Sequence, residues 1–397
     1  MVGKIKNGDD VVIVEATRSP IGRRNGSMAG FHSADLLGSL QAEVLRRAGA
    51  DPAAVDQVIG GIISQVGQQA FNVTRTAWLA AGLPETTAAT SVDCQCGSSQ
   101  QASSFIHALI ASGLVDVGVA CGVEVMSRVP LGSGLSQGVG KGVPRSYFQR
   151  YEYTTQFEAA ERIAERWGLT RQETDALGVE SQARAAQAWA EGRFDSQILA
   201  VDAPELGEDG KPTGTTSRVE RDECLRPTTM EGLANLKPVA REDGVHTAGT
   251  SSQIADAAAA VLMTRRSKAD ELGLTSRARI IDSCLVGSDP VLMLTGPIPA
   301  SQMLLERNGM TIDDVDVVEI NEAFASVVLA WERELKPDHD RVNPNGGAIA
   351  MGHALGSTGC VLLTKALHEL ERTDKSVALV TMCCGGGLAT ATLLERV

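Results

Sequence analysis

Two pairs of cysteines stand beside glycines where an apolar run gives way to polar sequence. The first pair lies in SVDCQCGSSQQ, where Cys96 comes directly before a predicted helix. Backbone N–H groups at a helix start favour a thiolate, so Cys96 is a candidate nucleophile with a lowered pKa. The opposing interpretation is a small, inert core residue, since free cysteine is often buried. We expect Cys94 to lie still on the preceding strand.

The second pair ends the apolar run ALVTM, and three glycines follow Cys383 and Cys384. Successive amides in such a turn can bind an anion, although the same residues suit a tight bend between two strands. Another Gly-rich segment, NPNGGAIAMGHALG, holds His353. Glycines there let the backbone approach a ligand closely, whereas a histidine in a mobile surface loop needs no function.

Asn321 and Glu322 follow the apolar stretch VVEI. Polar residues at such a place can cap the next helix or aim an amide into a site. All four segments lie where a predicted strand gives way to a loop or helix, which is where ligands bind in open α/β sheets. A zinc site is disfavoured because the spacings C-x-C and C-C differ from the usual C-x2-C pairs.

An internal repeat indicates how these segments are positioned. A shift of 260 positions superimposes residues 42–60 on 302–320, with six identities in register. The same shift superimposes the helix pattern of 98–113 on 358–373 and the strand pattern of 115–120 on 375–380. Any two helix–turn–strand units look alike, but six identities in phase favour duplication. We expect two copies of one α/β unit, each built around its own sheet.

Composition narrows the function classes. No apolar run in the 397 residues approaches a membrane span, and the length exceeds what one core usually supports. A net charge of −13 and 4% aromatic residues argue against nucleic-acid binding. The eight cysteines are too sparse for a disulfide framework, and the N-terminus lacks an export signal. We therefore expect a cytoplasmic protein with reduced thiols and neither nucleic-acid nor membrane partners.

The repeat also divides the chain. We expect an N-terminal half at 1–123, completed by about 247–276, and a C-terminal half at 277–397. Between them, 124–246 holds Gly-rich turns, Arg- and Ala-rich helices and the polar stretch ELGEDGKPTGTT. Such an insertion is a candidate ligand-binding loop domain, although a structural elaboration would have the same composition.

The four segments together resemble the thiolase family. Its signatures V-N-x-x-C-x-S-G, N-E-A-F-A, G-G-A-x-A-x-G-H-P-x-G and C-x-G-G-G correspond to VDCQCGSS, NEAFA, GGAIAMGHALG and CCGGG, in the family order. The resemblance extends to EATRSPIG, CGVEVMSRVP, LRPTTMEGLANLKP and HTAGTSSQIADAAAAV, and so spans nearly the whole chain. It looks especially similar to actinobacterial thiolases that degrade steroid side chains. It implies two similar α/β halves forming a layered α-β-α-β-α core with an inserted loop domain.

The resemblance also implies roles. Cys96 would carry the acyl group and His353 would act as its base, with the amides of Cys96 and Gly385 holding the oxyanion. Cys383 would move the α-proton, while Asn321, through a water, and His353 stabilise the enolate. Coenzyme A would be a substrate and no cofactor would be bound. Its candidate contacts are Arg226, Thr228, Ser252 and Gln156.

The implied reaction is the reversible cleavage of 3-ketoacyl-CoA by CoA, or its reverse condensation, in a homodimer or homotetramer. Gln156 stands where acetoacetyl-type thiolases have methionine, which hints at another substrate. The sequence departs from the family pattern at Asp93, Ser99, Ala354 and Ala255. Ala354 puts the aim of His353 in doubt, because proline would restrict the residue before it. The alternatives are a ketoacyl-synthase-like condensing enzyme and a catalytically silent acyl-CoA-binding protein.

Overall fold

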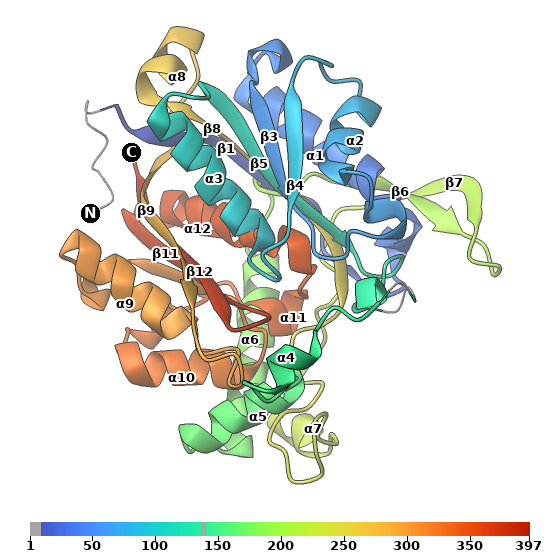
Figure 1. Cartoon of the computed structure of the whole chain (residues 1–397), viewed down its shortest axis with the longest axis vertical. Helices are drawn as coiled ribbons and strands as arrows, with labels where there is room; N and C mark the ends of the chain where they lie inside the picture. Colours follow the sequence, from blue (N-terminus) through green and yellow to red (C-terminus); the bar gives the residue numbers. More distant parts are fainter. Residues whose placement is uncertain (1–8, 136–137, 139) are drawn as a thin grey trace.

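One mixed sheet runs through the molecule. The computed structural model describes residues 9–135, 138 and 140–397. The strands follow one another across the sheet in the order β10-β11-β12-β9-β1-β8-β5-β3-β4, and β2 pairs with β8 (Figure 1). Their bounds are β1 Val11–Arg18, β2 Gly22–Arg23, β3 Gln57–Gly61, β4 Ala88–Val92, β5 Val117–Val125, β8 Ala255–Arg265, β9 Ala278–Gly287, β10 Val317–Ile320, β11 Val377–Cys384 and β12 Leu388–Arg396.

The predicted duplication is confirmed by topology and by local contacts. The order β3-β5-β8-β1 in the first half corresponds to β10-β11-β12-β9 in the second, with the first pair parallel and the other two antiparallel in each. Asp56 Oδ2 accepts the backbone N–H of Asp116 and Val117. Asp316 Oδ2, 260 positions later, accepts those of Ser376 and Val377. The same aspartate therefore ties the same strand start in both copies.

The expectation that each half would have its own sheet is wrong in one respect. Val12 and Ile13 of β1 pair with Arg279 and Ala278 of β9, so the two halves join into one sheet. Both strands would otherwise be edges, and unpaired edge N–H and C=O groups are costly when they lie inside a protein. The short pairing of β1 with β9 satisfies some of these backbone groups and holds the two halves together.

Helices form three layers around the two halves of the sheet. Helices α3 Ser98–Ser112 and α12 Thr358–Thr373 lie between the halves, and their apolar side chains share one core with both (Figure 1). Helices α1 Ser33–Ala48 and α2 Val73–Ala80 cover the outer face of the first half. Helices α9 Pro297–Asn308 and α10 Ala325–Leu335 cover that of the second. The predicted α-β-α-β-α layering is thus present.

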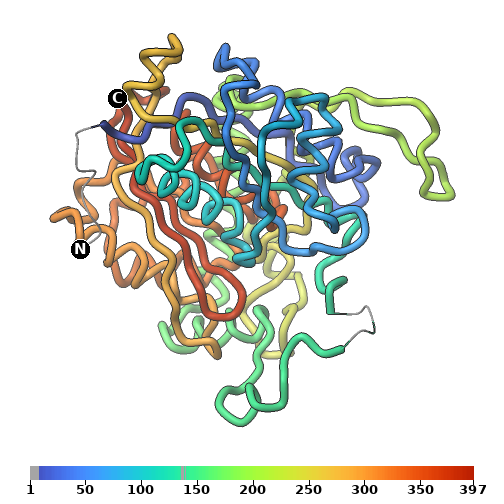
Figure 2. The backbone as a smooth tube through the Cα atoms, turned by 45° about the horizontal axis from the view of Figure 1, so that its top comes forward, coloured from blue at the N-terminus to red at the C-terminus, as the bar shows by residue number. Residues whose placement is uncertain are grey.

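Between β5 and β8 the chain forms a lobe that packs against both halves. Its helices and hairpin strands are α4 Arg145–Phe148, α5 Gln156–Arg166, α6 Arg171–Ala190, α7 Met230–Ala234, β6 Val201–Leu206 and β7 Pro212–Val219. Figures 1 and 2 show α4, α5 and α7 together at one end of the molecule and the β6–β7 hairpin projecting to one side. The remaining helices are α8 Arg266–Leu272 and α11 Ala348–Met351. No helix in the described ranges is long and apolar enough to cross a membrane.

Candidate active site

The structure brings the predicted reactive residues to one place. Cys96 lies just before α3, Asn321 directly follows β10, and Cys383 is the second-last residue of β11. Cys96, His353, Cys383 and Gly385 line one cleft. The two cysteines are 287 positions apart in the chain, so only the pairing of the two halves brings them together.

His353 is the most constrained of these groups. Only 4% of the residue is exposed, in contrast to a histidine in a mobile surface loop. Thr358 Oγ1 donates to the Ala354 carbonyl at 3.0 Å and lies 2.7 Å from His353 Nδ1. Thr358 therefore accepts from Nδ1–H, and we assign the lone pair to Nε2. The Asn321 amide lies 3.3 Å from Nε2 and donates to it.

These contacts answer the doubt that Ala354 raised about the aim of the ring. The backbone N–H of His353 donates to Gln253 at 2.9 Å, and the side chain is held on both nitrogens. These hydrogen bonds thus fix the orientation of His353, which a proline at position 354 would otherwise restrict through the backbone. Burial lowers the pKa of His353 to about 4, so the imidazole is neutral at physiological pH and able to accept a proton.

The expectation of a lowered pKa at Cys96 is wrong for the free protein. Burial raises the pKa of the thiol to about 11, and this outweighs the backbone N–H groups of Gly385 and Cys96, which lower it. The nearby carboxylate of Glu124 raises it further. A neutral thiol and a neutral imidazole therefore line the same cleft, and the thiolate has to form by proton transfer as the substrate reacts.

The position expected for Cys94 is also wrong. Strand β4 ends at Val92, and Asp93 Oδ1 accepts the N–H of Gln95 at 2.7 Å, which turns the chain. Gln95 adopts a left-handed backbone conformation, with φ of 50°. Cys94 and Cys96 are thereby bridged side by side after the strand. The turn that the Asp93 side chain stabilises ends the strand before Cys94, although the preceding residues have a strand-like pattern.

The three glycines that follow Cys384 form the bend between β11 and β12, as the structural interpretation predicted. Gly386 and Gly387 have positive φ values of 80° and 78°. The same bend also directs the backbone N–H of Gly385 to the sulfur of Cys96. The tight strand-to-strand bend is thus confirmed, and it places one amide at the sulfur of Cys96. Anion binding by successive amides of this turn stays a prediction. Burial raises the pKa of Cys383, which sits among apolar residues beside Cys96.

Two buried carboxylates brace the loops of the site, and neither was singled out for this role from sequence. Glu124 accepts the N–H groups of Ile63, Ser64 and Gly356 and the Gln69 amide. It so ties the first half to the loop that carries His353. Glu322 accepts Ser181 Oγ at 2.6 Å, the Asn343 amide and the N–H of Ile349 in α11. The only sequence signal was a charged residue at the end of an apolar strand.

The rest of the cleft wall is mostly apolar, and sequence reasoning missed it. Side chains from the first half, the lobe and the second half line it, namely Met126, Leu131, Phe157, Ile254, Leu294, Ala323, Phe324 and Leu355. Phe157 and Phe324 meet edge to face at 5.4 Å. Nothing in the local pattern of Leu294 or Met126 distinguishes these residues from ordinary core residues. A cleft with such walls suits an apolar group attached to a polar reacting end.

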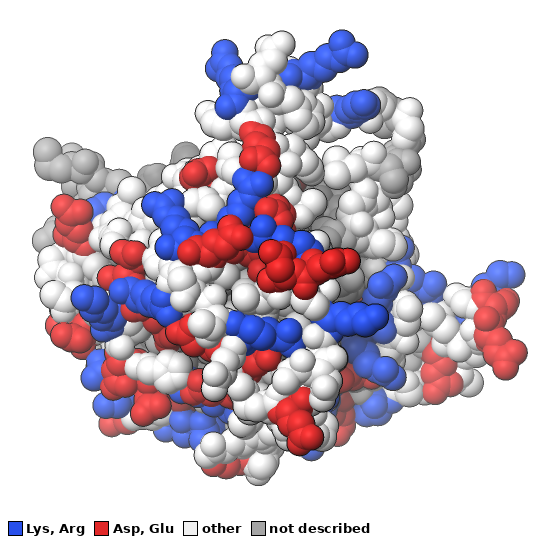
Figure 3. All heavy atoms as spheres, turned by 90° about the horizontal axis from the view of Figure 1, so that it is seen from below, with Lys and Arg blue, Asp and Glu red and all other residues white. Residues whose placement is uncertain are grey.

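The four candidate contacts for CoA divide into two groups. Gln156, at the first turn of α5, and Ser252 line the cleft. Arg226 and Thr228 lie outside its lining, on an exposed segment where Arg226 Nη2 donates to Ala248 at 2.8 Å. Figure 3 shows Lys and Arg side chains standing among Asp and Glu over one face of the molecule. A chain of net charge −13 therefore still offers local positive charge to an anion.

No group of three or more His, Cys, Asp or Glu side chains within the described part of the chain is arranged to hold a metal ion. All eight cysteines are free thiols. The predicted site residues Cys96, His353, Asn321 and Cys383 supply a thiol nucleophile, a neutral imidazole, an amide and a second thiol.

Comparisons with known proteins agree with this arrangement. The family models described as "Thiolase, N-terminal domain" and "Thiolase, C-terminal domain" match residues 11–267 and 274–396. The chain is 44% identical to the "Steroid 3-ketoacyl-CoA thiolase FadA6" of Mycobacterium tuberculosis, over 98% of this chain and 94% of that protein. It is 38% identical to the "Beta-ketoadipyl-CoA thiolase" of Escherichia coli, over 98% and 100%. The crystal structure of the Bacillus anthracis acetyl-CoA acetyltransferase superimposes with a TM-score of 0.88 at 34% identity, covering 98% and 99% of the two chains.

Proposed function

This chain belongs to the thiolase family, and we propose that it is a degradative thiolase, which cleaves a 3-ketoacyl-CoA with CoA through a thioester on Cys96. The observation that carries the proposal is the meeting of Cys96, His353 and Cys383 in one cleft, with Asn321 bonded to the imidazole. The names of the similar proteins, which are 3-ketoacyl-CoA thiolases in several bacteria, support the degradative direction.

The first half-reaction would begin with proton transfer from the Cys96 thiol to His353 Nε2, the nitrogen left free of a proton by the Thr358 contact. The thiolate attacks the 3-keto carbon, and the N–H groups of Cys96 and Gly385 receive the oxyanion. Cleavage of the bond between C2 and C3 releases the enolate of acetyl-CoA, which takes a proton from Cys383. Once protonated, His353 is a donor beside Asn321, and the two can stabilise the enolate oxygen.

The second half-reaction would release the acyl group. The thiol of a fresh CoA gives its proton to a neutral base and attacks the thioester of Cys96. His353 is the neutral base for this step once it has passed the proton from Cys96 on to the Cys383 thiolate, and its lowered pKa favours that return to the neutral form. As the acyl-CoA leaves, His353 gives the CoA proton to the Cys96 thiolate, which restores the free enzyme. The product is an acyl-CoA two carbons shorter than the substrate. Because acetyl-CoA leaves before the second CoA attacks the acyl-enzyme, the kinetics should be ping-pong.

We propose that the substrate has a large apolar acyl group of fatty-acid or steroid-side-chain type. Support comes from the mostly apolar side chains that line the cleft and from Gln156, which stands in that lining where acetoacetyl-type thiolases have methionine. The similarity to a steroid 3-ketoacyl-CoA thiolase points the same way. Arg226, Thr228, Ser252 and Gln156 stay our candidates for contacts with CoA.

A thiolysis panel tests this function. Purified protein is mixed with CoA and acetoacetyl-CoA, a long-chain 3-ketoacyl-CoA or a steroid-derived 3-ketoacyl-CoA, and loss of the 3-ketoacyl-CoA is followed. We expect the highest kcat/KM with a bulky acyl group. Condensation of malonyl thioesters without acyl exchange to free CoA would instead identify a ketoacyl-synthase-like enzyme. Binding of acyl-CoA with no turnover of any kind would identify a silent binding protein.

We further propose the division of the chain into an N-terminal half at 1–123 completed by 247–276, a loop domain at 124–246 and a C-terminal half at 277–397. Support comes from β8, which pairs with β1 and β5 although the loop domain precedes it in the chain. Eight free thiols also suit a reducing compartment, and we place the enzyme in the cytoplasm. Cell fractionation checks this placement, and recovery in a secreted fraction would contradict it.

We also propose that the chain forms a homodimer or homotetramer. Among the described residues, β4 has no strand on its outer side, and Phe71 beside it is 95% exposed. Such an edge is a ready site for pairing with another copy. Light scattering should give two or four times the chain mass of 41.7 kDa. Phe71→Asp should shift the protein toward monomer, whereas Met303→Asp on the outer helix α9 should not.

A further inference from the structure

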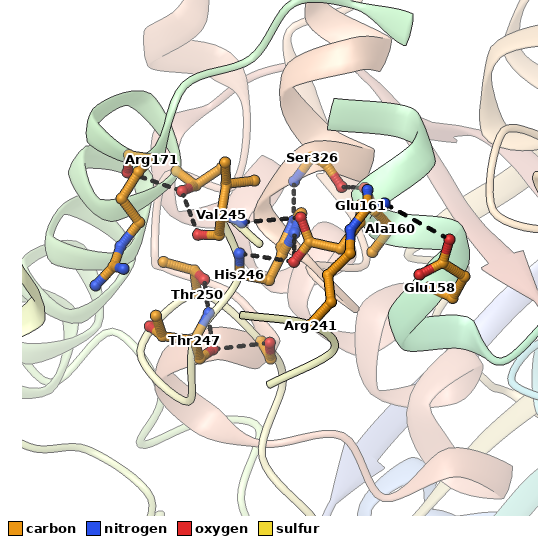
Figure 4. Close-up of polar contacts among 12 residues, drawn as sticks. Glu158, Ala160, Glu161, Arg171, Arg241, Val245, His246, Thr247, Thr250 and Ser326 are labelled. Atoms are coloured by element: carbon orange, nitrogen blue, oxygen red, sulfur yellow. Dashed lines mark hydrogen bonds and ion pairs between the residues drawn. The ribbon is translucent and has the colours of Figure 1, made fainter. Parts of the chain in front are cut away.

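A buried acid–imidazole pair lies outside the reacting groups. Glu161 of α5 and His246, which precedes β8, have side chains 2% and 0% exposed, and Glu161 Oε1 lies 3.2 Å from His246 Nδ1 (Figure 4). The approach is a close electrostatic contact rather than a well-aligned hydrogen bond. No step of the proposed reaction uses either group. A buried carboxylate beside an imidazole is costly to maintain unless its contacts organise something.

The protonation of this pair follows from its neighbours. The backbone N–H of Ser326 donates to His246 Nε2 at 3.3 Å, so Nε2 carries a lone pair and the proton lies on Nδ1, facing Glu161. Glu161 also accepts the N–H groups of Val245 at 2.8 Å and His246 at 3.0 Å. Burial alone would raise the pKa of Glu161. The contacts with His246 and Val245 outweigh burial and lower the pKa, so the carboxylate is charged. Figure 4 shows the contacts converging from three segments.

The same three segments form walls of the cleft. Helix α5 contributes Gln156 and Phe157, one turn before Glu161. The segment after His246 contributes Ser251 and Ser252. Helix α10 begins directly after Phe324, which lines the cleft. Its second residue, Ser326, donates its backbone N–H to His246. The pair therefore lies behind the lining of the cleft, where the three segments contact one another.

Ring contacts link the pair to the cleft surface. His246 packs edge to face on Phe324 at 5.6 Å, and Phe324 packs in the same way on Phe157 at 5.4 Å. Ser326 Oγ donates to the Ala160 carbonyl of α5 at 3.0 Å, which adds a second tie between the two helices. A shift of α5 away from α10 would thus open the space between Phe157 and Phe324.

We infer that Glu161 and His246 are positioning residues that hold α5 against the start of α10 and so set the width of the acyl-CoA cleft, an inference that rests on the proposed function. They make no contact with reacting atoms. Their loss should change how the cleft accepts bulky groups and leave the chemistry on small ones. The polar contacts, rather than the bulk of the imidazole, do this work, because Ser326 and Glu161 both meet ring nitrogens.

His246→Phe tests the polar contacts while keeping a ring against Phe324. Its matched control is His368→Phe, since His368 is a buried histidine, 7% exposed, that contacts Ser196 at 2.9 Å and belongs to α12. We expect His246→Phe to raise KM for a bulky 3-ketoacyl-CoA about tenfold, because the separated walls no longer contact both sides of the acyl group, with kcat on acetoacetyl-CoA changed by less than about twofold. The control should leave the ratio of the two KM values unchanged. Equal shifts in both variants, or none in His246→Phe, would overturn the inference.

A second readout separates this inference from the proposed function. Cys96 is alkylated with iodoacetamide and with N-phenylmaleimide, and the rate of each is read from the intact mass. The ratio of bulky to small reagent should rise about threefold or more in His246→Phe and stay at the wild-type value in His368→Phe. This ratio needs no turnover, so a wild-type protein without thiolysis would refute the function and not the positioning role. If His246→Phe does not fold, Glu161→Gln replaces it with the same expectations, and an unchanged ratio there refutes the pairing.

Discussion

The amide of Asn321 lies 3.3 Å from Nε2 of His353, on the ring nitrogen opposite the one that meets Thr358 at 2.7 Å. The imidazole is thereby fixed at both ends, with its lone pair directed to the amide side. Asn321 Oδ1 has no hydrogen-bond partner among the described residues and is buried. An arrangement that leaves one polar atom unsatisfied beside a fixed base is typical of a site that awaits substrate.

Removal of each sulfur should separate the two half-reactions. Cys96→Ala should abolish the covalent acyl-enzyme, since the mutation removes the thiol that the Gly385 amide contacts. Cys383→Ala should still be acylated by a simple acyl-CoA but should lose about 10²- to 10⁴-fold in thiolysis and condensation, because the α-proton then has no carrier. Intact mass after addition of acyl-CoA and steady-state rates measure the two effects. Cys384→Ala is the neighbouring control and should keep both activities.

Burial of His353 should make stability depend on pH. Its pKa is lowered to about 4, below the ordinary value of 6.5. Between these two pH values the imidazole is protonated in the unfolded chain and neutral in the folded chain. The stability is complete above pH 6.5 and is lost as the pH falls toward 4. Between pH 7 and pH 5 this residue should account for about 2 kcal/mol of lost stability.

Urea denaturation at the two pH values measures that loss. His353→Gln should reduce the difference between pH 7 and pH 5 by about 2 kcal/mol relative to the wild type. His32→Gln, at the exposed start of α1, should leave the difference unchanged. If His353→Gln kept the full wild-type difference in unfolding free energy between pH 7 and pH 5, His353 would not be the cause of that difference.

The effects on stability of replacing Lys365 and Glu319, which form a buried ion pair, should not be additive. Both side chains are fully buried, and Lys365 Nζ donates to Glu319 at 2.6 Å and to the Gly346 carbonyl at 2.7 Å. Lys365→Met leaves a carboxylate buried without its partner and should cost about 3 to 5 kcal/mol. Lys365→Met with Glu319→Leu should recover most of that loss. Lys268→Met, at an exposed pair, should cost less than about 1 kcal/mol by the same denaturation assay.

The central helices approach so closely that a single methyl group should separate them. A Cβ at Gly359 in α12 would lie 2.2 Å from the backbone N of Gln100 in α3. Gly359→Ala should therefore destabilise the protein by about 1 to 3 kcal/mol and lower the rate of Cys96 acylation, because α3 begins beside Cys96. Gly287→Ala has open space around its Cβ and is the control. Equal melting temperatures for the two variants would show that the helices can move apart freely.

The sequence by itself determined the parts of this protein that depend on local chemistry and order. The repeat at 260 positions predicted the matched elements, and the Gly49 and Gly309 helix ends recur at that spacing in the same left-handed conformation. The positions of Cys96, Asn321 and Cys383 next to strand or helix ends also followed from apolar periodicity and glycine placement. Such features need only neighbouring residues, because capping, turns and side-chain period act over a few positions.

Only the tertiary structure decided what depends on the surroundings of each group. The pKa of Cys96 is raised because distant segments remove water from the thiol, and this desolvation outweighs the helix start that the sequence displays. The pairing of β1 with β9 and the contact of Glu161 with His246, 85 positions away, likewise depend on how remote elements pack. Burial and long-range pairing belong to the assembled fold, since no spacing within a segment records which other segment will cover it.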